Sequence, residues 1–455
     1  MQLASLVLFA VFSLFTLLQR SRCHCARSRT REASLSLAVV ASRITACIGE
    51  VVEARSEMDA MEVAPLSAVK SGNMDIRINE VATIAARHAA AVDQDARFPQ
   101  EALAAAKAKE LLGIMVPREL GGEGVDISTV ADVCYRLGRA CGSTALIYAM
   151  HQVKLACLID PRETNEWQRR LLRRVAAEQL LLASSTTEGA AGANIRSSAA
   201  AIVHQGSRIT LDRKATCISY GAAADAVVTT ARRAEDAAAS DQVLVVFMKE
   251  DYTLEPIVPW NVLGMRGTAS VGYRLKASGV ADQILPEPYA KIHVRGMVPA
   301  AGITWSAAWA GIAADAVDRA RQFARAAARK SDGQLPPGAA HLTQALGQLD
   351  SLTALIASAA RRYEQVRRDE RLVEAPEFQT AMTLLKVNAS ELALGIVMNC
   401  LRACGLSGFR TDSEFSICRN LRDVLSSPIM INNDRILANL AGFSLMSQVP
   451  DRLLA

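Results

Sequence analysis

The segment CGLSGFRTDSEFSICRNLRDVLSSPIMINNDRI (404–436) concentrates residue types that take part in chemistry. A glycine-rich turn is followed by the adjacent charges Arg422 and Asp423, and then by Ile431. An isoleucine cannot accept a proton, so a reaction that needs a general base cannot use this side chain. Asp434 is three residues further along, which on a helix is nearly one turn away. The segment therefore offers charged groups but no evident proton acceptor at its centre.

The chain has ten cysteines and few histidines. Cys23 and Cys25 flank His24, but no second pair at ligand spacing accompanies them, so we predict no metal site. Most other cysteines lie in apolar contexts, which is typical of buried, reduced thiols in a cytosolic protein. His151 lies in an apolar helical run, where a packed or pocket-lining histidine is favoured over a catalytic one.

Length and composition favour a mostly helical globular protein of two to four structural units. The net charge of +5 is small for 455 residues, and basic residues are interleaved with acidic ones. We therefore predict no nucleic-acid partner.

The period of the hydrophobic pattern changes twice along the chain. It is helical from about 75 to 180, alternates in short glycine-broken runs from 181 to 298, and is helical again afterwards. We predict an N-terminal helical domain (74–180), a middle β domain (181–298) and a C-terminal four-helix bundle (299–455). The long helical segments of the bundle are expected at 302–330, 340–370, 374–404 and 431–446.

Residues 1–73 precede this body as an extension. Residues 3–18 form an uncharged apolar run that lacks the preceding Lys or Arg of a signal peptide and is slightly short for a membrane span. A clean helical pattern begins only at Met74. Three explanations stay open: an upstream stretch from an over-long gene model, a targeting or anchoring segment, and a disordered extension. We expect a cytoplasmic protein, with membrane anchoring by 3–18 as the alternative.

Several short motifs occur in the order found in the acyl-CoA dehydrogenases, and together they resemble that family over 75–446. They are LLGIMVPRELGGEGVD (111–126), TEGAAGAN (187–194), CIS (217–219), LGMRGTAS (263–270), RKSDG (329–333) and the segment 404–436. The resemblance implies an α+β fold that is mostly α, with the β domain between the N-terminal helices and the bundle.

The resemblance also implies FAD as cofactor. Thr187 would hydrogen-bond the edge of the flavin ring, and the backbone at Ile218 and Ser219 would face the ring nitrogen N5, with the Ser219 hydroxyl retained. Cys217 replaces the tryptophan that covers the flavin in the family, so the ring is expected to be less shielded. Ala193 replaces a serine, which removes one polar contact.

The pyrophosphate of FAD would be neutralised from the bundle. Arg329 would reach it from a neighbouring subunit as a charge-assisted donor, and Arg402 could add positive charge. Gly405 belongs to a glycine loop that allows close approach of the backbone to the cofactor. A homodimer or homotetramer follows from this resemblance.

Ile431 stands where the family has its catalytic glutamate, and Asn432 and Asn433 stand where it has Gly-Thr. A general base typically contributes roughly 10²–10⁴-fold to such a reaction. The second position used within the family falls near Ala300–Ala301, which also lacks a carboxylate. The backbone N–H of Ile431 could still polarise a carbonyl. The catalytic residue stays unknown, and the remaining carboxylates are distant candidates: Asp434, Glu188 and Asp315.

Three functions stay open. The first is an FAD-dependent oxidoreductase that acts on the CH–CH group of an acyl-CoA or related thioester, with a displaced base and an electron-transferring flavoprotein as acceptor. The second is a flavin-dependent monooxygenase of the same fold, which uses oxygen and reduced flavin from a flavin reductase. The third is a non-catalytic relative. The order of the motifs favours the first.

Overall fold

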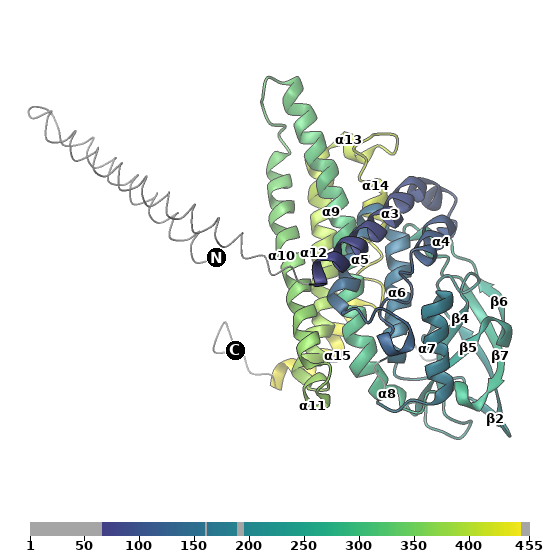
Figure 1. Cartoon of the computed structure of the whole chain (residues 1–455). Helices are drawn as coiled ribbons and strands as arrows, with labels where there is room; N and C mark the ends of the chain where they lie inside the picture. Colours follow the sequence, from purple (N-terminus) through teal and green to yellow (C-terminus); the bar gives the residue numbers. More distant parts are fainter. Residues whose placement is uncertain (1–65, 160–161, 189–194, 447–455) are drawn as a thin grey trace, which may run out of the picture. The chain divides into compact units, whose positions relative to one another are not determined.

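The computed structural model describes residues 66–159, 162–188 and 195–446 (Figure 1). The chain divides into two units, 1–71 and 72–455, and the second contains every element described below except the first residues of α3. The apolar run at 3–18 and the Cys23–Cys25 segment lie outside the described residues. Helix α3 begins at Leu66, so the prediction that the helix starts at Met74 placed its start too late.

In the described part of the chain, five α-helices precede the first strand. Helix α6 is buried along almost its whole length, as expected for an apolar core helix. Helix α5 starts where the Asp126 carboxylate accepts the Thr129 N–H at 2.8 Å, and the Asn165 side chain caps α7 in the same way. These helices are α3 (Leu66–Gln94), α4 (Gln100–Ala108), α5 (Ile127–Ala140), α6 (Gly142–Ile159) and α7 (Glu166–Glu178).

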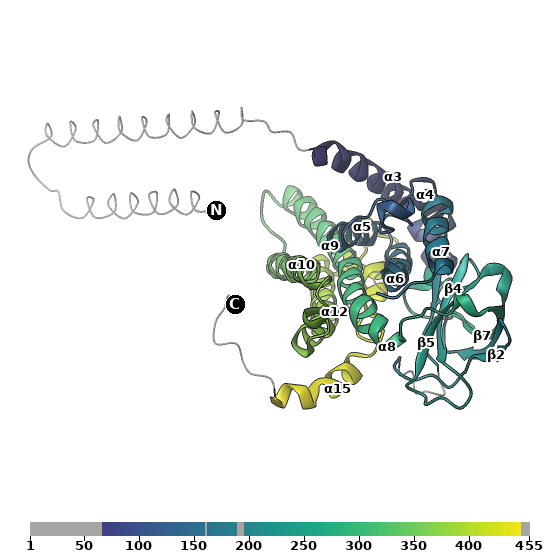
Figure 2. The ribbon, with the colours of Figure 1, turned by 60° about the horizontal axis from the view of Figure 1, so that its bottom comes forward.

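Among the described residues, seven strands form two small sheets between the helical regions. In the three-stranded sheet, β1 pairs parallel with β4, which pairs antiparallel with β5. The four-stranded sheet is antiparallel in the order β2-β3-β7-β6. The strands lie together at one side of the helices of the second unit (Figure 2). Their bounds are β1 Leu182–Ser185, β2 Val203–Gln205, β3 Arg208–Ala215, β4 Ala226–Arg232, β5 Gln242–Met248, β6 Tyr252–Val258 and β7 Gly272–Val280.

Helical structure resumes at Tyr289 rather than at 299, because α8 (Tyr289–Ile292) and a π-helical turn, η5 (His293–Met297), lead directly into α9. The four long helices are close to the predicted segments: α9 (Val298–Lys330), α10 (Ala339–Val366), α12 (Pro376–Cys404) and α15 (Asn433–Met446). Short helices lie between them: α11 (Glu370–Val373), α13 (Leu406–Phe409) and α14 (Cys418–Val424). The predicted fold class is confirmed.

Two helical stretches among the described residues are long and apolar enough to cross a membrane by length and composition alone. They are Tyr289–Lys330, whose most apolar window is 94% buried, and Pro376–Cys404, whose window is 50% buried. In α9 the burial comes from contacts with α5, α6, α10 and α12, so its apolar composition serves the core of the bundle.

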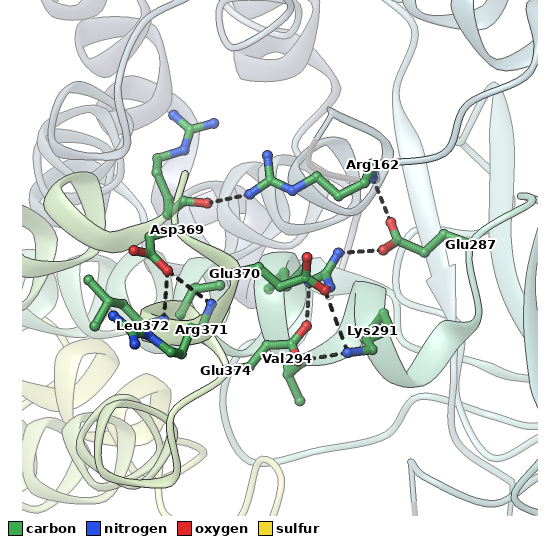
Figure 3. Close-up of polar contacts among 12 residues, drawn as sticks. Arg162, Glu287, Lys291, Val294, Asp369, Glu370, Arg371, Leu372 and Glu374 are labelled. Carbon is green, nitrogen blue, oxygen red and sulfur yellow. Dashed lines mark hydrogen bonds and ion pairs between the residues drawn. The ribbon is translucent and has the colours of Figure 1, made fainter.

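Arg295, on the π-helical turn, links the end of the β domain to the bundle. Figure 3 shows the acidic groups Glu287, Glu370 and Glu374 around this link, together with Lys291. The buried Arg295 guanidinium donates to Glu287 at 2.6 Å and to Glu374 at 2.5 Å, and it also contacts Glu370. Lys291 adds a second cation at 2.7 Å from Glu374. A guanidinium shared among three carboxylates fixes the direction in which the chain enters α9.

We expect Arg295→Met to lower the free energy of unfolding by about 3–5 kcal/mol, because it leaves the buried Glu287 carboxylate without its cation. Urea unfolding followed by circular dichroism measures this change. Arg274→Met is the matched control, since Arg274 pairs with Asp212 at an exposed site and its loss should change stability little. Equal effects of the two substitutions would contradict the role assigned to Arg295.

Candidate functional site

The turn 263–270 rests directly on the Arg422–Asp423 backbone. A Cβ atom at Gly264 would lie 1.9 Å from the Arg422 carbonyl oxygen, so only glycine allows this approach. The Met265 N–H donates to the Asp423 carboxylate at 2.6 Å, and the Gly267 N–H donates to the Ser143 hydroxyl of α6 at 3.2 Å. One turn therefore joins the β domain, α6 and α14.

Arg422 and Asp423 have different roles in this contact. Arg422 forms an ion pair with the Asp93 carboxylate of α3. The Asp93 backbone carbonyl also accepts a hydrogen bond from the Arg266 Nε at 2.6 Å. Asp423 is buried and turned inward toward Met265. The pair is thus a structural junction between helices and sheet, and its carboxylate is already engaged.

A chain of three hydroxyls runs from this turn into the predicted flavin region. The only hydroxyl hydrogen of Thr268 is directed to the Met265 carbonyl at 2.9 Å. Ser270 must then donate to Thr268 and Ser219 to Ser270, each at 2.8 Å. As a result, the half-buried Ser219 hydroxyl presents lone pairs and accepts hydrogen bonds from other groups.

Thr187 and Cys217 lie side by side at the edge of the same region. Burial raises the pKa of the Cys217 thiol, and a hydrogen bond with Thr187 opposes the shift. Ile218 is fully buried, and its N–H donates to the Val271 carbonyl at 2.9 Å. Because the Ile218 N–H already has an acceptor, the predicted contact between the backbone and the flavin remains possible only through the N–H of Ser219. The rest of the TEGAAGAN loop, 189–194 with Ala193, lies outside the described residues.

The backbone at Ile431 adopts an unusual conformation. Ile431 has φ +55° and Asn432 has φ +32°, a left-handed pair in which a β-branched residue is strained. The side chain is half-buried against the core. Within the described part of the chain, no hydrogen-bond acceptor faces the Ile431 N–H. The peptide donor predicted at this position is thus available.

The strained turn is anchored by its next residue. Asn433 is buried and donates to the Ser390 hydroxyl at 2.9 Å and to the Glu391 carboxylate at 2.7 Å. Its side-chain oxygen, Oδ1, accepts from the Lys386 ammonium at 2.6 Å. Burial lowers the pKa of Lys386 to about 8, while Glu391 opposes the shift. This network between α12 and α15 holds the left-handed pair in place.

Two of the three carboxylates considered as a displaced base, Asp315 and Glu188, are already engaged in hydrogen bonds and ion pairs. Asp434 is exposed on α15. Asp315 accepts from Arg319 and from Asn420, both at 2.8 Å. Glu188 is buried, accepts the N–H groups of residues 199 and 200, and lies 3.5 Å from Arg213. The second family position, Ala300–Ala301, is buried and apolar.

Arg329, Arg402 and Gly405 gather at the far end of the bundle. Arg329 is exposed in the last turn of α9, and Arg402 is exposed in the last turn of α12. The α9–α10 connection touches the end of α12, since a Cβ atom at Gly338 would lie 2.8 Å from the Ala403 carbonyl oxygen. Gly405 has φ +55° and open space around its Cα. These residues thus lie at helix ends of the bundle, whereas Thr187 and Ser219 belong to the β domain.

His151 is a structural residue. It is fully buried, its Nε2 donates to the Leu112 carbonyl at 2.8 Å, and its Nδ1 accepts the Leu182 N–H at 3.0 Å. Burial lowers its pKa to about 4, and the bond to Leu112 opposes the shift. Both nitrogens are occupied, which agrees with the expected packed histidine.

Sequence reasoning missed four residues that shape the site. Ser270 and Thr268 order the Ser219 hydroxyl, and Lys386 anchors the turn after Ile431. Lys154 is buried in α6. The two lysines carried a signal that could have been used, because each is a lone charge inside an apolar helical run.

The residues present fit a flavin dinucleotide. The half-buried Thr187 and the ordered Ser219 offer polar contacts for a ring edge, and exposed arginines at the bundle end offer charge for a pyrophosphate. Where the family motif has a tryptophan that covers the flavin, this chain has only the small side chain of Cys217.

Comparison with known proteins agrees with the motif order. The model of the acyl-CoA dehydrogenase N-terminal domain matches 79–179, and that of the C-terminal domain matches 301–442. Probable acyl-CoA dehydrogenase fadE25 of Mycobacterium leprae is 26% identical over 368 residues, which cover 77% of this chain and 88% of the relative. Cyclohex-1-ene-1-carbonyl-CoA dehydrogenase of Syntrophus aciditrophicus is 25% identical over 362 residues, covering 78% and 84%.

Solved structures share the fold. FMN-bound TdsC from Paenibacillus sp. A11-2 superimposes with a TM-score of 0.72 at 18% identity, covering 83% of this chain and 98% of TdsC. At this identity the likeness concerns the arrangement of helices and sheets.

The buried Asp423 should make stability depend on pH. Burial raises its pKa to about 6, although the Met265 N–H opposes the shift, whereas an unfolded aspartate titrates near 4. Between these values only the folded protein holds the proton, so rising pH removes up to about 2–3 kcal/mol of stability. Asp423→Asn should therefore flatten the decline in unfolding free energy from pH 4 to 6. The exposed Asp434→Asn should leave it unchanged, and parallel profiles for wild type and Asp423→Asn would refute the assignment.

Proposed function

Because this chain belongs to the acyl-CoA dehydrogenase superfamily, we propose that it is an FAD-dependent oxidoreductase that oxidises the Cα–Cβ bond of an acyl thioester. The observation that carries the proposal is the hydroxyl chain from Thr268 to Ser219, which the β domain holds against the Asp423 junction. A polar edge of this kind, with the half-buried Thr187 at its side, suits the hydrogen-bonding rim of a flavin.

FAD, when bound, supplies the acceptor for the hydride that leaves the β-carbon. Thr187 and Ser219 would hold the ring edge, the serine as an acceptor through its hydroxyl and as a donor through its N–H. Arg402 and Arg329 would neutralise the pyrophosphate, with Arg329 acting on the cofactor of a neighbouring subunit. Gly405 would let the backbone approach the cofactor closely.

The Ile431 N–H would donate to the thioester carbonyl and so favour loss of the α-proton. The Lys386–Asn433 network supports this role, because it keeps the donor in one orientation. The Ile431 side chain contributes no base. Proton removal in this chain therefore depends on a group other than residue 431, and turnover with simple acyl thioesters should be slow.

Monooxygenation is the second candidate, favoured by one observation. Cys217 replaces the covering tryptophan and is only half-buried, which leaves more room beside the ring. Such an enzyme would use oxygen and would need a separate flavin reductase.

The dehydrogenase proposal includes partners and location. An acyl-CoA or related thioester is the substrate, an electron-transferring flavoprotein takes the electrons, and the enzyme is a homodimer or homotetramer. The exposed Arg329 and Arg402 support an oligomer, because both lie in the last turns of bundle helices, α9 and α12, where a neighbouring subunit can reach them, whereas Thr187 belongs to the β domain. We also propose a cytoplasmic location for the enzyme.

The test is a flavin spectrum of the purified full-length protein. Bleaching under anaerobic acyl-CoA is the expected result and identifies a dehydrogenase. Oxygen consumption that requires a flavin reductase, without bleaching by acyl-CoA, identifies the monooxygenase instead. A colourless protein that stays colourless after addition of FAD would overturn both.

Placing a carboxylate at the vacant base position should raise activity. We expect Ile431→Glu to accelerate flavin bleaching by an acyl-CoA by roughly 10²–10⁴-fold, because a positioned base removes the α-proton. The substitution also removes a β-branched side chain from a positive φ. Stopped-flow absorbance measures the rate. Ile431→Gln, which has the same shape without basicity, should show no such gain, and an equal gain in both variants would count against the proposal.

A further inference from the structure

The loop that carries Ser219 contains a residue in a strained conformation. Tyr220 follows Ser219 directly, is 1% exposed and has φ +44°. A residue other than glycine seldom adopts a positive φ, and for a bulky side chain this conformation is an outlier. Such strain persists only where surrounding contacts hold it, and it is concentrated at active sites and ligand clamps. The contacts of Tyr220 therefore bear on the function of the loop.

Three polar groups of Tyr220 have partners in different segments. Its N–H donates to the Thr268 carbonyl at 2.8 Å, and its own carbonyl accepts the Ala223 N–H at 3.0 Å. Its hydroxyl donates to the Leu182 carbonyl of β1 at 2.9 Å. Burial raises the pKa of this phenol, so the hydroxyl keeps its proton and acts as a donor. The strained backbone is thus held at its N–H, at its carbonyl and through its side chain.

The hydroxyl contact fixes the loop to an edge strand. In the part of the chain that the structure describes, β1 pairs with β4 alone, so one of its edges has no neighbouring strand. Side chains take up both backbone groups of Leu182: its N–H donates to His151 of α6 at 3.0 Å, and its carbonyl accepts from Tyr220. Leu182 is fully buried, where an unpaired carbonyl is costly. This cost holds the Tyr220 hydroxyl at β1.

The turn that faces this loop is strained as well. Met265 has φ +52° and Ala269 has φ +46°. The hydrogen bond from the Tyr220 N–H joins the two turns, since its acceptor, Thr268, lies between these two residues in the chain. Strained residues therefore occur on both sides of one contact, which indicates that the geometry of the contact matters more than its local stability.

Ser219 is the residue whose position follows from these contacts. Its N–H has no acceptor among the residues described here. The peptide groups on either side are fixed, because the Ile218 N–H donates to the Val271 carbonyl at 2.9 Å and the Tyr220 N–H donates to Thr268 at 2.8 Å. The Ser219 N–H between them is thus free and held in one orientation at the predicted flavin region.

We propose that Tyr220 is a positioning residue for the flavin, which holds the Ser219 N–H and hydroxyl at the edge of the ring through its own hydroxyl bond to β1. The inference rests on the proposed function, since it requires a flavin at Ser219, and it adds a residue that acts through its neighbour. Without the hydroxyl bond, the strain at Tyr220 would relax and the loop would lose its single orientation. A preorganised donor binds more tightly than one that is ordered only on binding.

The test compares Tyr220→Phe with Tyr252→Phe in the full-length holoprotein. Phenylalanine keeps the ring and its packing, so Tyr220→Phe should fold. Tyr252 is the matched control, because it is also buried in the β domain, its hydroxyl lies 3.4 Å from the Ala224 carbonyl, and its backbone has an ordinary φ of −137°. We expect Tyr220→Phe to bind FAD roughly tenfold more weakly, because the loop must then be ordered on binding. Flavin released on dilution measures the affinity.

Tyr252→Phe should bind FAD as the wild type does. Equal affinities of all three proteins, or equal weakening in both variants, would overturn the proposal. The reduction potential of the bound flavin gives a reading that a merely structural role would not move. A donor at the ring edge stabilises the electron-rich reduced form, so we expect the potential to fall in Tyr220→Phe and to stay constant in Tyr252→Phe. An unchanged potential in Tyr220→Phe would contradict the positioning role.

Hydrogen exchange separates this inference from the proposed function. In full-length protein stripped of flavin, the segment 217–221 should exchange faster in Tyr220→Phe than in the wild type, and unchanged exchange would overturn the inference alone. Flavin binding that depends on Tyr220, without any response to acyl-CoA, would keep the positioning role and refute the thioester chemistry. A wild type that binds no flavin would overturn both.

Discussion

The contact between Met265 and Asp423 determines how the β domain meets the helices. A buried carboxylate accepts a backbone N–H there, and Gly264 allows the two main chains to touch. Two features of the predicted flavin region connect to this junction. The hydroxyl chain to Ser219 starts from the Met265 carbonyl, and the Gly267 N–H ties the same turn to α6.

The C-terminal turn is a strained segment that buried side chains hold in place. Ile431 and Asn432 adopt a left-handed conformation that favours glycine or asparagine, and the buried hydrogen bonds of Asn433 with Lys386 and Ser390 stabilise it. The direction of the Ile431 N–H is set by the backbone and does not depend on the side chain. In the function that we propose, this peptide N–H is the donor that the turn contributes, and the side chain of residue 431 contributes no base.

Motif order and hydrophobic period were sufficient for the architecture. The change from helical to alternating patterns near 181 and back again identifies three regions, because burial on one face imposes a period of 3.6 on helices and 2 on strands. The exact return to helix was missed. Pro288 precedes this segment, Tyr289–Met297, and a π-helical turn lies within it. The ion pairs of Arg295 hold the turn in place.

The sequence by itself determined the fold class, the order of the domains and the absence of a carboxylate at residue 431, since each depends on local pattern or residue identity. Only the tertiary structure decided that Asp423 is a buried acceptor, that the Ile218 N–H is already used, and that Arg213 lies 3.5 Å from the Glu188 carboxylate. These facts depend on which groups meet across distant segments. Burial and hydrogen-bond partners arise only when these segments pack together, so they cannot be deduced from residue type and spacing.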